Sequence, residues 1–298
     1  MIAIFLAEVK KLISWATLWV AVIFNIVINL LISYIQIRDR RIAGGSSRFH
    51  ITEYTGGVHQ LLFNITNPLM GIMGRLQLQG VLITVIATIY IFSYEQKNNT
   101  GYSVFVTKTG RSILLYKTIV SLAVSIILHF LIAIISLSAH FAVFDYRNVW
   151  NTNVSTTLNF IQCSFSLYGR PFTTWTYFSV AAYFLAHFGL GFGMIICSML
   201  MIIILWVLFM DGYITFFVML LINVTFYMLP EVLPLSVQAR FLLMHTPVWL
   251  YINSGLWFTY GGIVLWRYFE LLGMGVSLMI LILLCVFSIK QFGKSDIS

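Results

Sequence analysis

Charged residues are scarce in this chain of 298 residues: Asp, Glu, Lys and Arg make up 9% of it, against roughly 25% of an average globular domain. Apolar residues make up 60%, and the mean hydropathy is +0.95. A soluble protein of this size cannot bury so much apolar surface in a single core. The composition therefore excludes a water-soluble domain and predicts a protein that lies mostly in lipid.

Cysteines are also few. Cys163, Cys197 and Cys285 are odd in number and show no paired spacing, so they indicate neither a disulfide framework nor a zinc site. Basic residues outnumber acidic ones by 17 to 9, but no segment carries five clustered basic residues. The net charge of +8 is therefore typical of loop topology and contact with anionic headgroups, and it does not indicate nucleic-acid binding.

Long apolar runs are what the sequence has in abundance. A hydrocarbon core of roughly 30 Å needs about 20 helical residues to cross it. We predict an all-α polytopic membrane protein with transmembrane helices over residues 12–35, 78–94, 118–144, 177–210, 213–229 and 271–289. The first run is too long for a signal peptide and precedes no small-residue cleavage site, so we expect it to be retained.

A further apolar segment, residues 247–266, holds three Trp and three Gly. Tryptophan favours the headgroup level of the bilayer, and glycine weakens a continuous helix. We therefore expect a re-entrant or interfacial segment on the outer side, with a seventh span as the alternative.

The distribution of Lys and Arg predicts that both termini lie in the cytoplasm, because basic residues concentrate in cytoplasmic loops. In this orientation residues 36–77, 145–176 and 230–270 form three outer loops. The inner segments then carry a high density of basic residues, namely Lys10, Lys11, Lys97, Lys108, Arg111, Lys117, Lys290 and Lys294. A seventh span would place the last two of these outside.

The predicted inner segment 95–117 is the most informative stretch. Glu95 follows the second span directly, Gly101 permits a turn, and Arg111 and Lys117 lead into the third span. This pattern indicates a compact cytosolic elbow whose polar groups could dock another protein. An ordinary positively charged inner loop is the alternative, and the spacing alone favours neither.

The order Glu95, Gly101, Arg111, Lys117 between the second and third of six spans resembles the permease subunits of type-2 ABC exporters. Residues 7–11 (Ala-Glu-Val-Lys-Lys) resemble the amphipathic lead-in of that family. The resemblance implies that residues from about Asn98 to Leu114 form a coupling helix against a nucleotide-binding subunit. The implied ATPase-coupling residues are Glu95, Asn98, Gly101, Thr107, Arg111 and Lys117.

The same resemblance implies partners and a cargo. A second permease chain, identical or homologous, would pair with this one, and a dimer of cytosolic ABC ATPase subunits would bind Mg-ATP. The chain itself has no G-x-x-x-x-G-K-[S/T] phosphate loop, so we expect no catalytic residue and no cofactor on it. The implied cargo is amphipathic or hydrophobic (an antimicrobial or toxin-like peptide, a drug or a lipid), exported through the plasma membrane of a bacterium.

Polar residues within the predicted spans are candidates for a translocation surface, because they need partners in lipid. The candidates are Asn25, Asn29 and Ser33 on one face of the first span, Thr84 and Thr88 on one face of the second, and Asn223 in the fifth. Hydrogen bonding between helices, at about 1 kcal/mol per pair, is the alternative role.

Small residues and histidines within the spans indicate packing. Gly189 and Gly193 in the fourth span predict a ridge that permits close helix contact. His129, His140 and His187 have no His or carboxylate three or four residues further on, so we predict core histidines and no metal site.

Two other functions remain as alternatives to an exporter subunit. The first is an ATP-independent secondary carrier or channel. No Asp, Glu, Lys or Arg lies centrally in the six predicted spans, which argues against coupling to protons or sodium ions. The second is a membrane-embedded enzyme or a signalling partner that uses the intramembrane histidines.

Overall fold

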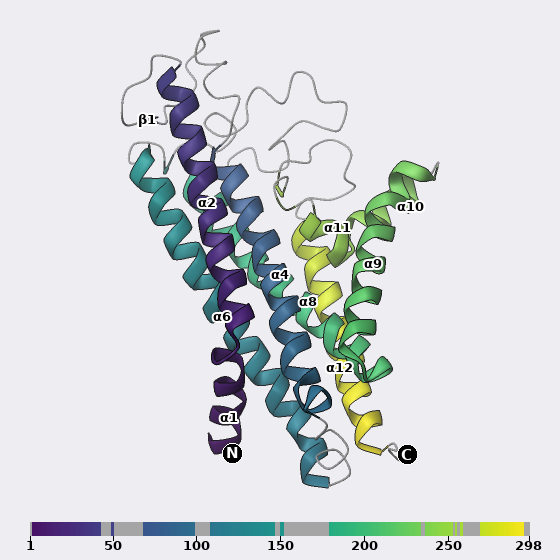
Figure 1. Cartoon of the computed structure of the whole chain (residues 1–298). Helices are drawn as coiled ribbons and strands as arrows, with labels where there is room; N and C mark the ends of the chain where they lie inside the picture. The colour runs from purple at the N-terminus through teal and green to yellow at the C-terminus, as the bar shows by residue number, and fades with distance from the viewer. Residues whose placement is uncertain are drawn as a thin grey trace.

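The computed structural model describes residues 2–42, 49–50, 68–98, 108–146, 150–151, 179–233, 236–252, 254, 257–258 and 269–294. Most of them form a bundle of helices (Figure 1). The helices are α1 (Ile2–Ile13), α2 (Ala16–Ile42), α4 (Pro68–Lys97), α6 (Lys108–Val143), α8 (Val180–Phe209), α9 (Gly212–Val232), α10 (Val237–Met244), α11 (Pro247–Ile252) and α12 (Phe269–Lys294). The two-residue strands β1 (Phe49–His50) and β2 (Phe144–Asp145) pair in parallel.

Five helices in the described part of the chain are long and apolar enough to cross a membrane: α4, α6, α8, α9 and α12. The helices α1 and α2 meet at a bend of 61° and add a sixth candidate if the pair counts as one span. The prediction of a helical, multi-pass membrane protein is confirmed at this level. Within the segment 247–266, the structure shows the short helix α11 and describes no membrane-length helix.

Several helices extend beyond the predicted spans. α4 begins at Pro68, ten residues before the predicted start, and α6 begins at Lys108, also ten residues early. Hydropathy detects only the lipid-embedded part of a helix, whereas backbone hydrogen bonding continues into the polar interface. The predicted elbow 95–117 is therefore largely helical at both of its ends, and residues 99–107 lie outside the described residues.

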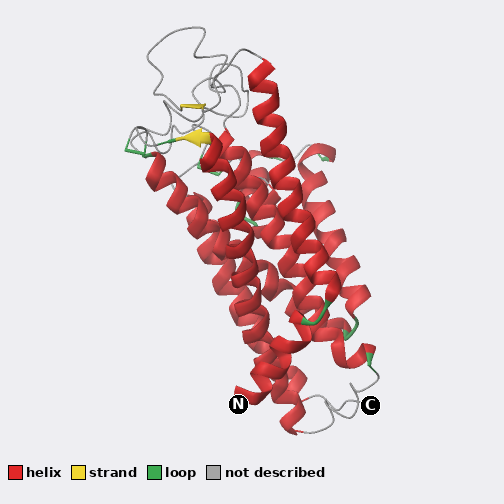
Figure 2. Ribbon diagram, turned by 60° about the vertical axis from the view of Figure 1, so that its left-hand side comes forward, coloured by secondary structure: helices red, strands yellow, loops and turns green. Residues whose placement is uncertain are grey.

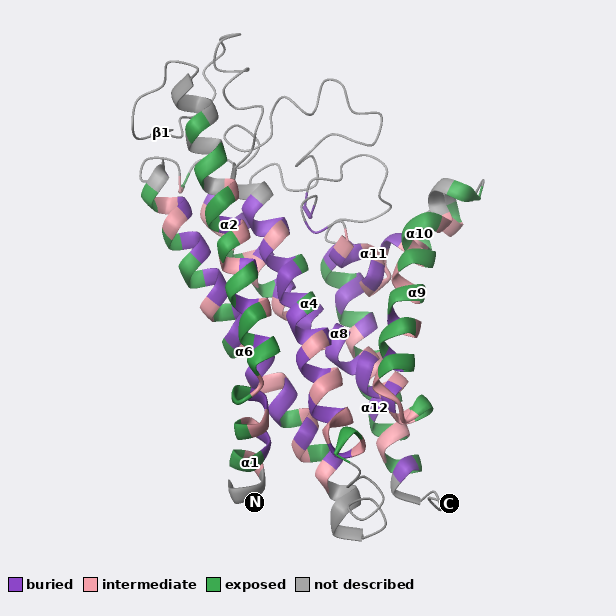
Figure 3. Ribbon diagram, in the orientation of Figure 1, coloured by how far each residue is buried: buried purple, intermediate pink, exposed green. Residues whose placement is uncertain are grey.

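The helix α4 lies at the centre of the bundle, where most of its surface is buried (Figure 3). Within its most apolar stretch 61% of the residues are buried, against 11% in α9. α4 packs mainly against α6 and α8, and α8 packs in turn against α12. α9 instead exposes apolar side chains such as Leu220, Leu221 and Val224, which suits contact with lipid tails.

A tight turn joins α8 to α9. Met210 adopts a left-handed conformation with φ 52°, and the Asp211 carboxylate accepts a hydrogen bond from the backbone N–H of Ile214 at 2.8 Å. This carboxylate caps the first turn of α9 and lies at the positive end of its dipole. A Cβ atom on Gly212 would collide with the Ser93 side chain of α4. The turn therefore docks closely onto α4.

Both ends of the described chain lie at the same end of the bundle as the α4–α6 connection (Figures 1 and 2). We call this the inner end, because the distribution of basic residues predicts that it faces the cytoplasm. The helices α10 and α11 lie at the opposite, outer end.

Ser254 and Phe258, which follow α11 in the chain, are bonded into the outer end of the bundle. An imidazole nitrogen of His187 in α8 lies 2.8 Å from the Ser254 carbonyl oxygen, and the Ser254 hydroxyl donates to the Gly74 carbonyl of α4 at 3.0 Å. The backbone N–H of Phe258 donates to the Glu270 carboxylate of α12 at 2.8 Å. Three transmembrane-length helices thus hold these two residues in place.

Candidate functional site

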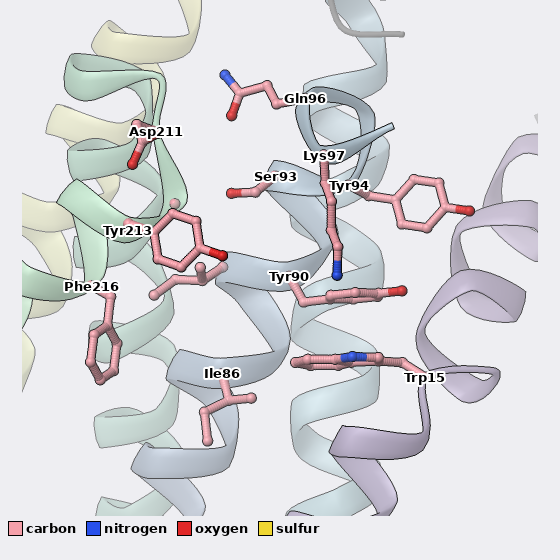
Figure 4. Close-up of a pocket in the computed structure, with 12 residues that line it drawn as sticks. Trp15, Ile86, Tyr90, Ser93, Tyr94, Gln96, Lys97, Asp211, Tyr213 and Phe216 are labelled. Carbon is pink, nitrogen blue, oxygen red and sulfur yellow. The ribbon is translucent and has the colours of Figure 1, made fainter. Parts of the chain in front are cut away.

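A pocket of about 620 Å³ lies at the inner end, between the beginning of α2, the last turns of α4 and the first turns of α9 (Figure 4). Ligand sites in proteins typically measure roughly 300–1,000 Å³. Ile86 and Phe216 line the deeper part, while Ser93, Gln96 and Asp211 lie at the other end. The pocket is therefore amphipathic, with one apolar end and one polar end.

Two stacked aromatic rings form one wall of the pocket. The ring centroids of Trp15 and Tyr90 are 3.8 Å apart, and the ring planes differ by 3°. Trp15 lies at the bend between α1 and α2, so the bend places an aromatic side chain against α4. Tyr94 follows one turn after Tyr90 and meets it edge-on, with centroids 5.8 Å apart. This wall offers a large apolar area and ring faces that attract cations.

The opposite wall comes from the first turns of α9. Tyr213 is 89% exposed and Phe216 is 45% exposed, so packing within the chain leaves both rings accessible to a ligand. Lys97 and Asp211 add one charge of each sign to the lining. The pocket can therefore accept an apolar group together with a polar or charged head.

A buried network of ion pairs borders the aromatic wall. The Lys11 ammonium lies 2.5 Å from a Glu8 oxygen and 2.8 Å from Oε1 of Glu95. The Lys117 ammonium pairs with Oε2 of Glu95 and also donates to the Ile91 carbonyl oxygen. Lys117 is fully buried and Glu95 is 4% exposed. One carboxylate thus links α1, α4 and α6.

The charges of this network balance, which lowers the free-energy cost of burying them near the membrane. A buried charge costs several kcal/mol unless it is paired and hydrogen-bonded, and here two lysines meet two glutamates. Lys11 also lies 4.8 Å from the centre of the Tyr94 ring, which connects the network to the pocket wall. The network therefore fixes α1 and the α4–α6 pair as one block.

The predicted ATPase-coupling residues lie in different surroundings. The side chains of Glu95 and Lys117 are inside the network, where they bind neighbouring helices of the same chain. Asn98 is exposed just after the end of α4, and its amide donates to the Tyr94 carbonyl oxygen at 2.9 Å. Gly101, Thr107 and the side chain of Arg111 lie outside the described residues.

Asn29, one of the predicted translocation residues, takes part in hydrogen bonds between helices. Its amide nitrogen donates to Gln79 of α4 at 2.6 Å and to Ser136 of α6 at 3.0 Å. These three buried side chains join α2, α4 and α6. The contacts of Asn29 thus fit the alternative role, which is hydrogen bonding between helices.

Among the other predicted translocation residues, the four with described side chains do not line the pocket either. Asn25, Thr84 and Asn223 each donate to a carbonyl oxygen one turn earlier in their own helix. Thr88 is fully buried, and its hydroxyl has no hydrogen-bond partner among the described residues. The side chain of Ser33 lies outside the described residues.

The two predicted packing glycines of α8 have different neighbours. A Cβ atom on Gly193 would lie 2.8 Å from the sulfur of Met274 in α12, whereas one on Gly189 would meet nothing within 4 Å. Gly191 lies against the Gln77 side chain of α4. Close helix contacts of α8 therefore involve Gly193 toward α12 and Gly191 toward α4.

Sequence reasoning missed the pocket and the full ion-pair network. The aromatic residues near the inner ends of the spans were a signal, but such residues are also typical of the headgroup belt. Opposite charges at the inner ends of three helices were the signal for the network. Within the part of the chain that the structure describes, no group of three His, Cys, Asp or Glu could hold a metal ion.

Comparison with models of known protein families, with curated proteins and with solved structures finds no match to this chain. Its function therefore has to be inferred from its own residues.

Proposed function

We propose that this chain is the transmembrane permease subunit of an ATP-driven exporter of the type-2 ABC kind, which moves an amphipathic or hydrophobic molecule out of the cell. One observation carries the proposal: the pocket and the predicted coupling segment share the last turn of α4. Gln96 and Lys97 line the pocket, and the connection to α6 follows directly after them. A force on that connection would therefore reach the pocket without an intermediate element.

The buried network supports transmission of such a force. Because Glu95 binds Lys11 and Lys117, ion pairs join the inner ends of α1, α4 and α6. The opposite pocket wall belongs to α9, which is the least buried of the five membrane-length helices. Two hydrogen bonds hold α4 to the α8–α9 hairpin, from Gln96 to the Met210 carbonyl and from the Trp206 indole to Ser93 at 3.1 Å.

In this scheme, cytosolic subunits that bind Mg-ATP press on the α4–α6 connection as they dimerise. The block of α1, α4 and α6 then shifts relative to α9, which changes the shape and access of the pocket. ATP binding acts as a population shift between two arrangements of the same helices. An identical or homologous permease chain completes the exporter.

The pocket also supports the class of cargo. Its apolar end and aromatic walls favour a hydrocarbon or aromatic group, and its polar end favours a polar or charged head. An amphipathic peptide, drug or lipid has both parts. A small hydrophilic ion would leave the apolar walls without a partner.

Replacing Phe216 by Ala is expected to weaken binding of an amphipathic ligand by about tenfold, because burying a Phe side chain is worth about 1.5–3 kcal/mol. Fluorescence titration of the purified chain with dansyl-dodecylamine measures this. The matched control is Phe217→Ala, since Phe217 is the next residue, is 63% exposed and is not part of the pocket lining. Equal dissociation constants for the two variants would contradict a ligand site here.

Charge reversal at Arg111 is expected to separate the chain from its ATPase. Affinity purification of the wild type followed by mass spectrometry should recover a subunit with an ATP-binding phosphate loop, and Arg111→Glu should reduce that recovery by about tenfold or more. The control is Lys290→Glu, because Lys290 is exposed at the inner end on α12. Glu95 and Lys117 are unsuitable probes, since their substitution disrupts the buried network.

A different outcome would favour the alternative function. If the wild type purifies without an ATPase and moves the amphipathic probe across liposomes alone, the chain is an ATP-independent carrier or channel. Equal recovery of the ATPase with Arg111→Glu and Lys290→Glu would contradict the proposed docking role of Arg111.

A further inference from the structure

One face of α6 is polar over its inner half. Lys117, Ser121, Ser125 and His129 follow each other at intervals of four residues, which places them on the same side of the helix. Each of them is at most 1% exposed. Buried polar and ionisable side chains are expensive in a membrane and usually mark a functional path.

α4 presents a matching polar face to α6. Gly80, Thr84, Thr88 and Glu95 recur at helical spacing on one side of α4, and Gln77 continues this line toward the outer end, where α4 also meets Gly191 of α8. Two contacts set the register of this antiparallel pair. At the inner end Glu95 binds Lys117, and further toward the outer end a Cβ atom on Gly80 would collide with the ring of His129.

Several polar atoms along this α4–α6 seam lack partners. Among the described residues no hydrogen bond reaches the hydroxyls of Thr88, Ser121 and Ser125, the two ring nitrogens of His129 or the two amide atoms of Gln77. Buried polar groups in proteins are nearly always satisfied, either by protein or by buried water. Lipid tails offer no alternative, so the seam favours an occupant that both donates and accepts hydrogen bonds.

The spacing of the side chains fits water. Four residues of α-helix rise about 6 Å, which is too far for one serine hydroxyl to bond the next. A water molecule that makes two hydrogen bonds of about 2.8 Å spans about 5.6 Å. From Gln77 to Glu95, α4 rises about 27 Å, close to the hydrocarbon thickness of roughly 30 Å.

We propose that the seam formed by Gln77, Thr88, Ser121, Ser125 and His129 holds a single file of water molecules and conducts protons between the Glu95–Lys117 pair and the outer end. Each hydroxyl or water accepts a proton on one side and releases another on the other side. One proton therefore enters as one leaves, and no electrons are transferred. This activity goes beyond the proposed exporter role and does not depend on an ATPase.

His129 is the ionisable group of the file. Its ring can accept a proton at one nitrogen and release a proton from the other, so it passes a proton on without moving from its place. Phe188 and Phe192 of α8 flank it, with ring centroids 5.7 and 5.6 Å away, and keep the path narrow. The sequence predicts a core histidine at this position, and the structure does bury it, at 1% exposed.

The test is proton flux through the purified full chain in liposomes that contain the pH dye pyranine. A potassium gradient with valinomycin sets the membrane potential. We expect dye acidification about tenfold faster than in protein-free liposomes, and a fall of about tenfold with Ser125→Leu, which fills the file. Ser125→Ala removes only the hydroxyl and should still slow the flux several-fold.

The matched control is Ser198→Ala. Ser198 is also a buried serine, but its hydroxyl donates to the Met194 carbonyl oxygen of its own helix at 2.9 Å. Its substitution should leave the flux unchanged. Wild-type flux at the protein-free level overturns the proposal, and so does an equal effect of Ser125→Ala and Ser198→Ala. Recovery of an ATPase is scored separately, so failure here leaves the exporter proposal standing.

Discussion

Replacing Lys117 by Met is expected to lower the free energy of unfolding by about 3 kcal/mol, because it leaves the buried carboxylate of Glu95 with one cationic partner in place of two. Lys11 remains bonded to that carboxylate. The expected loss of stability is therefore at the lower end of the range that is typical when a buried ion pair loses one partner. Unfolding of the purified chain in mixed micelles of increasing denaturing-detergent content measures the change. Lys290→Met removes an exposed charge at the same end and should change stability by less than about 0.5 kcal/mol.

A double variant distinguishes pairing from simple loss of packing. Glu95→Leu together with Lys117→Met removes both partners and leaves the Glu8–Lys11 pair in balance. Replacing both members of a buried pair by apolar groups is often nearly neutral. The double variant should therefore be clearly more stable than Lys117→Met alone. A loss equal to the sum of the two single losses would refute the pairing.

Replacing Gly273 by Ala is expected to destabilise the protein by about 2 kcal/mol, the typical cost of adding a methyl group to a closely packed site. The new Cβ atom would lie 2.9 Å from the carbonyl oxygen and 3.0 Å from the Cα atom of His245. Both are backbone atoms, so α12 must move away from the junction of α10 and α11. Thermal unfolding in detergent measures the loss.

Gly275 provides the matched control on the same helix. A Cβ atom there meets nothing within 4 Å, so Gly275→Ala should leave stability unchanged or raise it by up to about 1 kcal/mol through helix propensity. If the two alanine variants unfold at the same temperature, the close approach of α12 to His245 is wrong.

Helices bounded by strong local signals were predictable from the sequence. The prediction of 177–210 lies within three residues of α8 (Val180–Phe209) at each end. Its start is capped by Ser179, whose side chain accepts from the Ala182 N–H, and Asp211 begins the next helix. Capping and hydropathy are both local, so the sequence carries them directly.

The bend between α1 and α2 was not predictable in the same way. Hydropathy is continuous across Ser14 and Trp15, and the bend depends on contacts from other parts of the fold. The Trp15 ring stacks on Tyr90 of α4, 75 residues further along the chain, with ring centroids 3.8 Å apart. A run of apolar residues does not encode such contacts.

The same limit applies to the candidate site. Glu95 and Lys117 stood out by their spacing, but Lys11 lies 84 positions before Glu95, and no local pattern connects them. The pocket forms where the ends of three separate helices meet, so its lining residues are scattered through the sequence. Asn29 was correctly recognised as needing a partner, yet the identity of Gln79 and Ser136 as those partners required the structure.

The ion-pair network also constrains the order in which the chain is assembled. Glu95 and Lys117 lie on consecutive helices, so this hairpin can enter the bilayer with its two charges already neutralised by each other. Lys11 leaves the ribosome before Glu95, yet its ion pair with that carboxylate forms only once the hairpin is in place. The helix α1 therefore docks after α4 and α6, although it is synthesised before them.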